Sequence, residues 1–189
     1  MNGTSIMIVG VGGQGTLLAS RILGAVALGE GYDVKVSEVH GMSQRGGSVV
    51  TYVRYGEKVY SPIIDKKGAD IVLAFEKLEA VRALPFLKDG GKMIVNTQEI
   101  DPMPVITGAC EYPQGLLETL SGASSLTAVD ALSLALDAGS VKAVNVVLIG
   151  VLAKSTGIPK EKWLAALSST VPPKFLELNL RAFELGYNS

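Results

Sequence analysis

The sequence predicts an α/β protein of Rossmann-like type, with an open, mostly parallel sheet, helices on both faces, an added β-hairpin and a helical C-terminal part. Short β-branched apolar runs alternate with amphipathic segments in the first half of the chain, which is typical of a parallel sheet covered by helices. A glycine-rich turn joins the first apolar run to the first amphipathic segment. From Ser140 onward, apolar positions recur three and four residues apart, which indicates helices.

The first half is expected to contain strands that end in glycine-rich or polar turns. Four of them lie at residues 5–10, 33–39, 69–75 and 92–97, the last after the turn KDGG. Residues 48–64 predict two more strands, which meet at Gly56 and Glu57, because glycine readily takes the positive φ of a tight hairpin turn.

Helices are expected between these strands. The first spans residues 16–31 and carries apolar side chains on one face, at Leu18, Ile22 and Val26. The second spans residues 76–87 and is interrupted by a proline, which removes a main-chain donor.

The second half of the chain predicts mainly helices. It begins with a strand, a short helix and a strand or loop, at residues 106–112, 113–122 and 124–131. Three helices follow at residues 141–157, 159–169 and 172–186, and the last two have proline near their starts, where it is tolerated. The apolar run 143–153 is shorter than the roughly 20 residues that span a bilayer, so it predicts a buried helix. No repeat or linker divides residues 1–189, which are expected to form one domain.

The composition excludes several classes of function. Hydrophobic residues make up 48% and charged residues 19% of the chain, with a net charge of -1, so no basic surface for nucleic acid or a membrane is expected. The single cysteine, Cys110, fits a reducing cytoplasm and cannot supply the thiolates of an iron–sulfur cluster. The first residues lead directly into a strand rather than a signal sequence, which also indicates a cytoplasmic protein.

The motif GVGGQG is the first candidate site, because Gly10, Gly12 and Gly15 fit the pattern G-x-G-x-x-G between a strand and a helix. Glu38 ends the second strand, where dinucleotide-binding folds carry an acid for the ribose. One interpretation is therefore a dinucleotide site. A second is a sharp turn that only brings the helix close to the sheet. A third is a site for an anion at the helix N-terminus, which would include Gly13.

The stretch EVHGMSQRGGS, residues 38–48, is the second candidate site. His40 is the only histidine of the chain and can exchange protons near neutral pH, and Arg45 can bind a carboxylate or phosphate. Further hydrogen-bonding groups come from Ser43, Gln44 and the amides of Gly46 and Gly47. A solvated loop without a ligand is the alternative. Ligands bind at the carboxyl ends of strands in open α/β sheets, however, which favours a functional loop here.

Three further features are weaker candidates. Cys110 lies next to Glu111 but has no second histidine as a partner, so a buried, inert thiol is expected. Asn145 lies within an apolar helix, where its amide is expected to form a structural cross-link rather than to line a pocket. Trp163 and the leucines and phenylalanines of residues 175–185 are expected in the core, although part of that apolar surface could meet a partner.

Four segments together resemble the gamma-domain family of 2-oxoacid:ferredoxin oxidoreductases, and above all its members that act on indolepyruvate. They are GVGGQG, EVHGMSQRGGSV, ADIVLAFEKLEAVRALPFLKDGGKMIVNT and VNVVLIGVL. The resemblance extends over nearly the whole chain, and the glycine turn combined with HGMSQRGGS is more specific than either motif alone.

The resemblance implies a small subunit of a hetero-oligomer that oxidatively decarboxylates a 2-oxoacid, here an arylpyruvate such as indolepyruvate. Thiamine diphosphate and 4Fe-4S clusters would lie on a large partner subunit, electrons would pass to ferredoxin through the complex, and the acyl group would pass to coenzyme A. The chain lacks the sequence Gly-Asp-Gly, with which thiamine diphosphate motifs begin. By itself it is expected to be inactive and to hold no cofactor, no metal ion and no catalytic residue.

The resemblance also assigns a place to the two candidate sites. Residues of the second would border the acceptor site or the subunit interface: Glu38, His40, Ser43, Gln44, Arg45, Gly46 and Gly47. The glycine turn would lie beneath them: Gly10, Gly12, Gly13 and Gly15. Two other functions remain as alternatives, an NAD(P)-dependent dehydrogenase, with His40 as its only obvious acid–base group, and a nucleotide-sensing Rossmann module.

Overall fold

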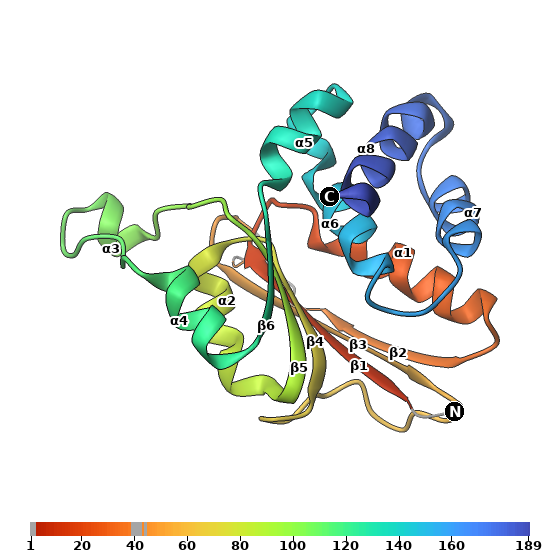
Figure 1. The fold of residues 1–189 in the computed structure, drawn as a ribbon, viewed down its shortest axis with the longest axis horizontal. Helices are drawn as coiled ribbons and strands as arrows, with labels where there is room; N and C mark the ends of the chain where they lie inside the picture. Colours follow the sequence, from red (N-terminus) through yellow and green to blue (C-terminus); the bar gives the residue numbers. More distant parts are fainter. Residues whose placement is uncertain (1–2, 39–42, 44) are drawn as a thin grey trace.

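The computed structural model describes residues 3–38, 43 and 45–189 and contains a six-stranded sheet in the order β2-β3-β1-β4-β5-β6 (Figure 1). The strands are β1 (Thr4–Val11), β2 (Asp33–Glu38), β3 (Ser48–Gly56), β4 (Ala69–Ala74), β5 (Leu87–Asn96) and β6 (Ser125–Val129). β1, β4, β5 and β6 pair in parallel, whereas β3 is antiparallel to both of its neighbours, β1 and β2. The carboxyl ends of the other five strands therefore meet the beginning of β3 at one edge, called the carboxyl edge below.

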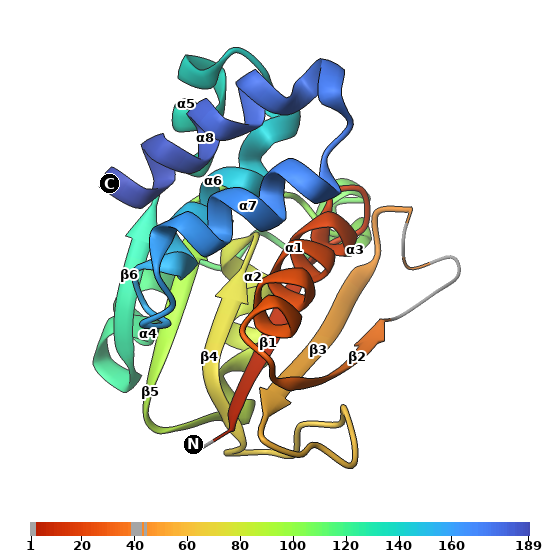
Figure 2. The same ribbon diagram turned by 90° about the vertical axis from the view of Figure 1, so that its right-hand side faces the viewer.

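Helices cover both faces of the sheet (Figure 1, Figure 2). One face packs against α1 (Thr16–Gly29), α5 (Ala131–Ala138), α6 (Val144–Ala153), α7 (Lys160–Thr170) and α8 (Leu176–Asn188). The other face packs against α2 (Lys77–Ala83) and α4 (Leu116–Ala123). Side chains of β1 alternate between the two cores, because successive residues of a strand point to opposite faces. The predicted Rossmann-like architecture is confirmed.

Short helices complete the described elements: α3 (Met103–Ile106) and the 3-10 turns η2 (Leu84–Phe86), η3 (Val141–Ala143) and η4 (Pro173–Phe175). α2 ends just before η2, which contains the proline expected to interrupt it. Every residue of α6 is buried, as the apolar run predicts, and Trp163 and Phe183 lie in the core, whereas Phe175 is half exposed. No helix in the described part of the chain has both the length and the apolar character needed to cross a bilayer.

The hairpin predicted at Gly56 and Glu57 is wrong, because the chain leaves the sheet after Gly56 and β3 pairs with β1 and β2 instead. Gly56 does not adopt a positive φ. Its lack of a side chain serves a close approach instead, since a Cβ atom there would lie 2.8 Å from the Cα of Gly3.

Side chains satisfy the main-chain groups of the segment after Gly56, so it does not need a partner strand. The carboxylate of Asp33 accepts a hydrogen bond from the amide of Val59 (3.0 Å). The guanidinium of Arg54 donates to the carbonyls of Ser61 (3.0 Å) and Ile63 (3.1 Å). The competing side-chain bonds explain why a β-branched sequence forms no strand here.

The strand predicted at residues 106–112 is also wrong, and Cys110 is exposed rather than buried. α3 ends at Ile106, and exposed turns follow it. The amides of Ala109 (2.8 Å) and Cys110 (3.3 Å) both donate to the carbonyl of Pro104. Because these hydrogen bonds close a local turn, the segment never reaches the sheet that would have buried the thiol.

The structure also differs from the prediction at β5 and at α5. β5 begins at Leu87, because the residues KDGG form an irregularity within the strand, with Gly90 at φ 75°, rather than a turn before it. α5 was not predicted. It begins at Asp130, whose carboxylate accepts a hydrogen bond from the amide of Ser133 (3.0 Å), and it ends at Gly139 with φ 114°.

α6 and α8 cross with their backbones in contact, because each helix carries a glycine at the crossing. A Cβ atom at Gly186 would lie 2.0 Å from the carbonyl oxygen of Val147, and one at Gly150 would lie 2.3 Å from that of Phe183. No side chain fits in this space. The position of α8, and with it the cover over α6, therefore depends on these two residues.

Replacing Gly186 by alanine is expected to destabilise the chain by about 3 kcal/mol or more, because the added methyl group meets main-chain atoms and forces the helices apart. Gly24→Ala in α1 is the matched control, since no atom lies within 4 Å of its Cβ position. That change is expected to leave stability unchanged or to raise it by up to about 1 kcal/mol. Urea unfolding followed by circular dichroism measures both, and equal effects would contradict the proposed packing.

Candidate functional site

The glycine turn lies at the carboxyl edge, between β1 and α1, and three of its glycines have a geometric reason to be there. Gly13 and Gly15 have φ values of 103° and 83°, which disfavour other residues. A Cβ atom at Gly10 would lie 2.8 Å from Gln14 Oε1 and 2.9 Å from the Cβ of Phe75. The turn therefore brings the chain close to both β4 and the start of α1.

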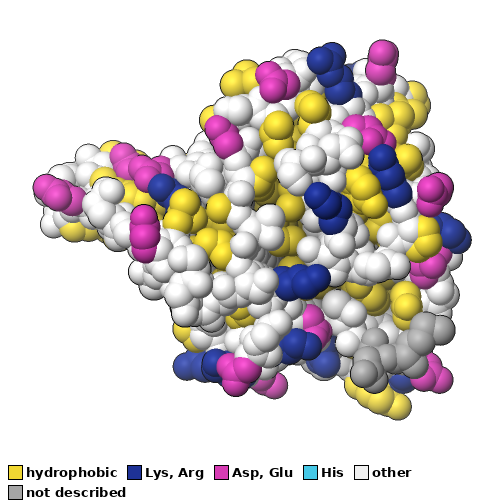
Figure 3. Space-filling model, viewed as in Figure 1, with side chains coloured by type: hydrophobic (Ala, Val, Ile, Leu, Met, Phe, Trp, Pro, Cys, Tyr) yellow, Lys and Arg dark blue, Asp and Glu magenta, His cyan; other side chains and the backbone are white. Residues whose placement is uncertain are grey.

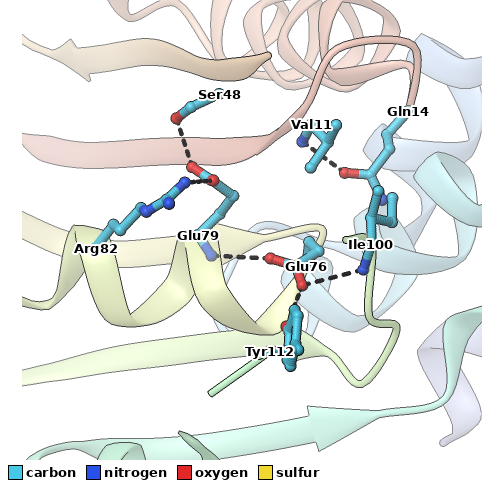
Figure 4. A network of polar contacts seen from close by, with 8 residues as sticks. All are labelled: Val11, Gln14, Ser48, Glu76, Glu79, Arg82, Ile100 and Tyr112. Atoms are coloured by element: carbon cyan, nitrogen blue, oxygen red, sulfur yellow. Dashed lines mark hydrogen bonds and ion pairs between the residues drawn. The ribbon is translucent and has the colours of Figure 1, made fainter. Parts of the chain in front are cut away.

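Gln14 folds back onto the end of β1, where its side chain contacts Val11 (Figure 4), and it also reaches the end of the neighbouring strand β4. The chain leaves β1 for α1 on one face and leaves β4 for α2 on the other, and such a switch point is where open α/β sheets commonly bind ligands. Here Gln14 Oε1 accepts a hydrogen bond from the amide of Val11 (2.8 Å), and its Nε2 donates to the carbonyl of Phe75 (3.0 Å). The side chain of Gln14 therefore links the chain ends that leave the two paired strands, just beyond the last main-chain bond between them, from the amide of Phe75 to the carbonyl of Val9 (2.9 Å).

Asn145 of α6 binds the end of the glycine turn that leads into α1. Its Nδ2 donates to the carbonyl of Gly15 (3.2 Å), and its Oδ1 accepts a hydrogen bond from the amide of Val146 (2.9 Å). The same Nδ2 atom would lie 2.5 Å from a Cβ atom at Gly15. The structural cross-link predicted for Asn145 is confirmed, and its partner is the glycine turn.

The described part of the second candidate site is bound to the glycine turn. The amide of Gly12 donates to the carbonyl of Gly47 (2.8 Å), and the amide of Gly47 donates to the carbonyl of Ser43 (3.0 Å). Gly46 has φ 88°, which permits this bend. His40 and Gln44 lie outside the described residues. The structure thus brings Ser43, Gly46 and Gly47 together with the glycine turn.

The two charged residues of this candidate site have different surroundings. Glu38 accepts a hydrogen bond from the hydroxyl of Ser20 (2.5 Å) in α1, so one of its oxygens is already bound. Arg45 is exposed, and its guanidinium forms no ion pair with the described residues. Arg45 is therefore available to a ligand or a partner, whereas Glu38 fastens the end of β2 to α1.

A cavity of about 270 Å³ lies between the glycine turn, α1 and β3. Its lining comprises Gly12, Gly13, Gly15, Thr16, Leu17, Val49 and Thr51. Thr16 is 7% and Thr51 2% exposed, and neither hydroxyl forms a hydrogen bond with a described group. Among the described residues, Trp163 Nε1 is the one fully buried side-chain polar atom without a partner, so the two threonine hydroxyls keep some accessible surface beside the cavity. The amides of Leu18 and Ala19 both donate to the carbonyl of Gly15. The amides of the two preceding helical residues, Thr16 and Leu17, have no acceptor among the described residues, as is usual at the start of a helix.

These unpaired donors indicate what the cavity can bind. Because they are not sealed in the core, the two threonine hydroxyls can form hydrogen bonds with water or a ligand in the cavity. Here two hydroxyls and the free amides at the N-terminus of a 14-residue helix surround one space. Such a combination favours an oxyanion, since the helix end carries partial positive charge and presents N–H groups.

A network of buried carboxylates lies on the other side of the switch point, under the loop that follows β5 (Figure 4). Glu76 is 1% exposed, and its carboxylate caps α2 by accepting a hydrogen bond from the amide of Glu79 (3.0 Å). The same carboxylate also accepts hydrogen bonds from the amide of Ile100 (3.3 Å) and the hydroxyl of Tyr112. Burial and, secondarily, the carboxylate of Glu76 raise the pKa of Tyr112, so the phenol stays protonated and continues to donate. Glu79 pairs with Arg82. These acids are fully engaged, which indicates a structural role.

Several residues of the site were missed in the sequence. Gln14 and Thr16 lie within or next to the glycine motif, where a polar residue signals a possible contact to the turn. Glu76 directly follows a buried strand, which is the usual place for a ligand or cap. Thr51 gave no signal, because a β-branched residue is ordinary in a strand. No cluster of three or more His, Cys, Asp or Glu side chains among the described residues is suited to a metal ion.

A family model, curated relatives and solved structures all relate this chain to subunits of 2-oxoacid oxidoreductases. Residues 5–189 match the family model described as Pyruvate ferredoxin/flavodoxin oxidoreductase. The chain is 45% identical to "Indolepyruvate oxidoreductase subunit IorB" of Thermococcus kodakarensis, over 96% of this chain and 93% of the relative. It is 30% identical to the "Pyruvate/ketoisovalerate oxidoreductases common subunit gamma" of the same organism, over 95% and 92%. A keto/oxoacid ferredoxin oxidoreductase gamma subunit from Geobacter sulfurreducens has a similar structure, with a TM-score of 0.74 at 26% identity over 98% of this chain and 96% of that chain.

The bridge made by Gln14 can be tested with an isosteric change. In Gln14→Glu an oxygen replaces the Nε2 donor and faces the carbonyl of Phe75, so a loss of about 1–3 kcal/mol of stability is expected at pH 7. The loss should shrink as the pH falls, because a protonated carboxyl can donate to that carbonyl and its protonation is favoured in the folded state. Urea unfolding at pH 7 and pH 5, with wild type as reference, measures both effects. A loss that does not depend on pH would argue against the bridge.

Proposed function

The chain belongs to the pyruvate ferredoxin/flavodoxin oxidoreductase family, as a small, gamma-type subunit of a 2-oxoacid:ferredoxin oxidoreductase, and we propose that the substrate of its enzyme is indolepyruvate or a related arylpyruvate. The observation that carries this proposal is a contrast within one organism. The Thermococcus kodakarensis relative named for indolepyruvate is 45% identical to this chain, whereas the relative named for pyruvate and ketoisovalerate is 30% identical.

The cofactors of the reaction are proposed to lie on a large partner subunit. The 189 residues contain one cysteine and no Gly-Asp-Gly sequence, so they offer neither the ligand set of a 4Fe-4S cluster nor the usual start of a thiamine diphosphate motif. The partner would decarboxylate the 2-oxoacid and pass electrons to ferredoxin. This chain would contribute one gamma-type domain to a hetero-oligomer in the cytoplasm, where its single thiol stays reduced.

The part played by this chain is proposed to be the binding of the acceptor, coenzyme A. Coenzyme A carries several phosphate groups, and the cavity beside the glycine turn presents the hydroxyls of Thr16 and Thr51 and the free amides of α1. Arg45 is near the Gly12–Gly47 contact in the sequence and has no ion pair among the described residues. A guanidinium matches a phosphate with two parallel hydrogen bonds. These groups would orient the acceptor and take no part in bond breaking.

The nucleotide-dependent alternatives have less support from the geometry. In a dehydrogenase of this fold, the ligand would occupy the switch point and an acid after the second strand would bind the ribose. Gln14 bridges the switch point here, and Glu38 is bound to Ser20. The indolepyruvate enzyme therefore remains the better proposal.

Activity should require the partner. The purified chain, supplied with indolepyruvate, coenzyme A and thiamine diphosphate, is expected to reduce no viologen dye, because it holds neither a thiamine site nor a cluster. Addition of the large subunit should start the reaction. The rate of dye reduction is the measurement, with pyruvate as the comparison substrate. Turnover by the isolated chain would refute the proposal, and preference for pyruvate would overturn the substrate assignment.

The role of Thr51 can be separated from its contribution to folding. Thr51→Val keeps the shape of a buried side chain that is 2% exposed and removes only its unpaired hydroxyl, so stability should be unchanged or slightly higher. In the assembled enzyme the KM for coenzyme A should rise roughly ten-fold, because a hydrogen bond to a charged group is worth about 1.5–3 kcal/mol. Thr127→Val, on the exposed strand β6, is the control. An unchanged KM would remove Thr51 from the acceptor site.

A further inference from the structure

Residues 101–111, called the projecting arm below, extend from the carboxyl edge away from the rest of the molecule and contain α3 (Figure 1). None of the residues in the arm is buried. Its main-chain hydrogen bonds close turns within the arm, such as those from Val105 to Pro102 (2.9 Å) and from Thr107 to Met103 (2.9 Å). A single helical turn is too short to be stable alone in water. The shape of the arm therefore has to be fixed at its base.

Glu76 fixes both ends of that base with one carboxylate oxygen. The oxygen accepts hydrogen bonds from the amide of Ile100, just before the arm, and from the hydroxyl of Tyr112, just after it (Figure 4). Next to it, the amide of Lys77 donates to the carbonyl of Gln98 (3.3 Å). Burying a carboxylate is costly unless several donors compensate it. The molecule thus uses a buried charge to hold a segment that contributes nothing to the core.

The surface of the arm is apolar and acidic. Met103 is 66% and Ile106 65% exposed, and in Figure 3 hydrophobic side chains on the arm are flanked by acidic ones. Residues 97–118 contain no lysine or arginine but four acids: Glu99, Asp101, Glu111 and Glu118. Lys77 pairs with Glu99, and the other three form no ion pair within the described chain. Exposed apolar groups with a rim of one charge are typical of a binding surface.

This surface continues toward the glycine turn. Leu136 of α5 and Val141 of η3 are 56% and 52% exposed. A cavity of about 500 Å³ connects this region to the carboxyl edge, and its lining comprises Gly13, Gln14, Gly15, Gln98, Leu132, Val141, Lys142 and Val144. A partner that covers the arm and α5 would therefore also close over one side of the glycine turn.

We propose that the projecting arm is a docking element for the large, cofactor-bearing subunit, which receives it in an apolar socket lined with lysine or arginine. This inference rests on the proposed function for the existence of that subunit. The arm itself carries two acids, Asp101 and Glu111, and no lysine or arginine, and this negative charge favours a basic partner surface. A second copy of this chain does not suit the arm, because a symmetric contact between two arms would bring their acids together.

The only cysteine of the chain provides a direct test, because Cys110 lies on the arm and is exposed. The purified chain and the assembled complex are treated with N-ethylmaleimide, and mass spectrometry follows the peptide that contains Cys110. In the complex, modification should be slower by about ten-fold or more, because a packed interface excludes the reagent. Equal rates in the two samples would overturn the proposal.

A matched pair of substitutions tests the apolar contact. Ile106→Glu places a charge on the arm, whereas Ile63→Glu places one on a side chain that is 50% exposed, in the segment after β3 that lies away from the carboxyl edge. Both chains should keep the wild-type melting temperature. Ile106→Glu should weaken assembly with the large subunit by about ten-fold or more, since apolar anchors dominate interface energies, while Ile63→Glu assembles normally. Equal assembly of the two variants would contradict the docking role.

The outcome also separates this inference from the proposed function. If the wild-type chain forms an active complex but Cys110 stays reactive and Ile106→Glu assembles normally, the arm is not the docking element and the proposed function stands. If the wild-type chain assembles with no thiamine-dependent partner at all, both are overturned. If the complex instead contains only copies of this chain and protects Cys110, the assigned occupant is wrong.

Discussion

The bridge from Gln14 to the ends of β1 and β4 is the interaction on which the carboxyl edge depends. The chain departs to opposite faces just beyond the last main-chain bond between these two strands. At this point the side chain of Gln14, with an acceptor toward Val11 and a donor toward Phe75, extends the pairing of the strands by one further link. Gly10 has to lack a side chain for Gln14 to reach this position. The bridge thus explains Gly10, and the positive φ of Gly13 and Gly15 explains two more glycines of the motif, before any ligand is considered.

The two sides of that bridge differ in how completely their polar groups are paired. Glu76 and Glu79 use main-chain amides, hydroxyls and Arg82 as partners, and such fully satisfied networks rigidify a fold. Thr16 and Thr51, on the α1 side, have no partner in the described chain, and their hydroxyls are not fully buried. Water or a ligand in the cavity can therefore serve as their partner. This difference, more than the glycine motif itself, makes the α1 side the candidate for ligand binding.

The sequence predicts the sheet, the alternation of helices and the position of the glycine turn, because periodicity records which faces are buried. The prediction is wrong where a side chain far away in the sequence forms hydrogen bonds with main-chain groups that a strand would otherwise have paired. Arg54 and Asp33 bind the segment after β3, and no local pattern in that segment reveals them. Cys110 was expected in a strand because its neighbours are apolar or β-branched, but Pro104 accepts the hydrogen bonds that a strand would have needed. The candidate residues around Gly12 and Gly47 could be named from sequence, whereas Thr51 could be recognised only from its place in the lining of the cavity.

The carboxylate of Glu76 connects the arm to the rest of the carboxyl edge. One oxygen holds the base of the arm, and the other caps α2 through the amide of Glu79. The carboxylate of Glu79 in turn receives the hydroxyl of Ser48, the residue that follows the Gly46–Gly47 bend. A continuous series of hydrogen bonds therefore runs from the base of the arm, through the first turn of α2, to the first residue of β3. The arm and the strand end beside the glycine turn are thus held by the same two carboxylates.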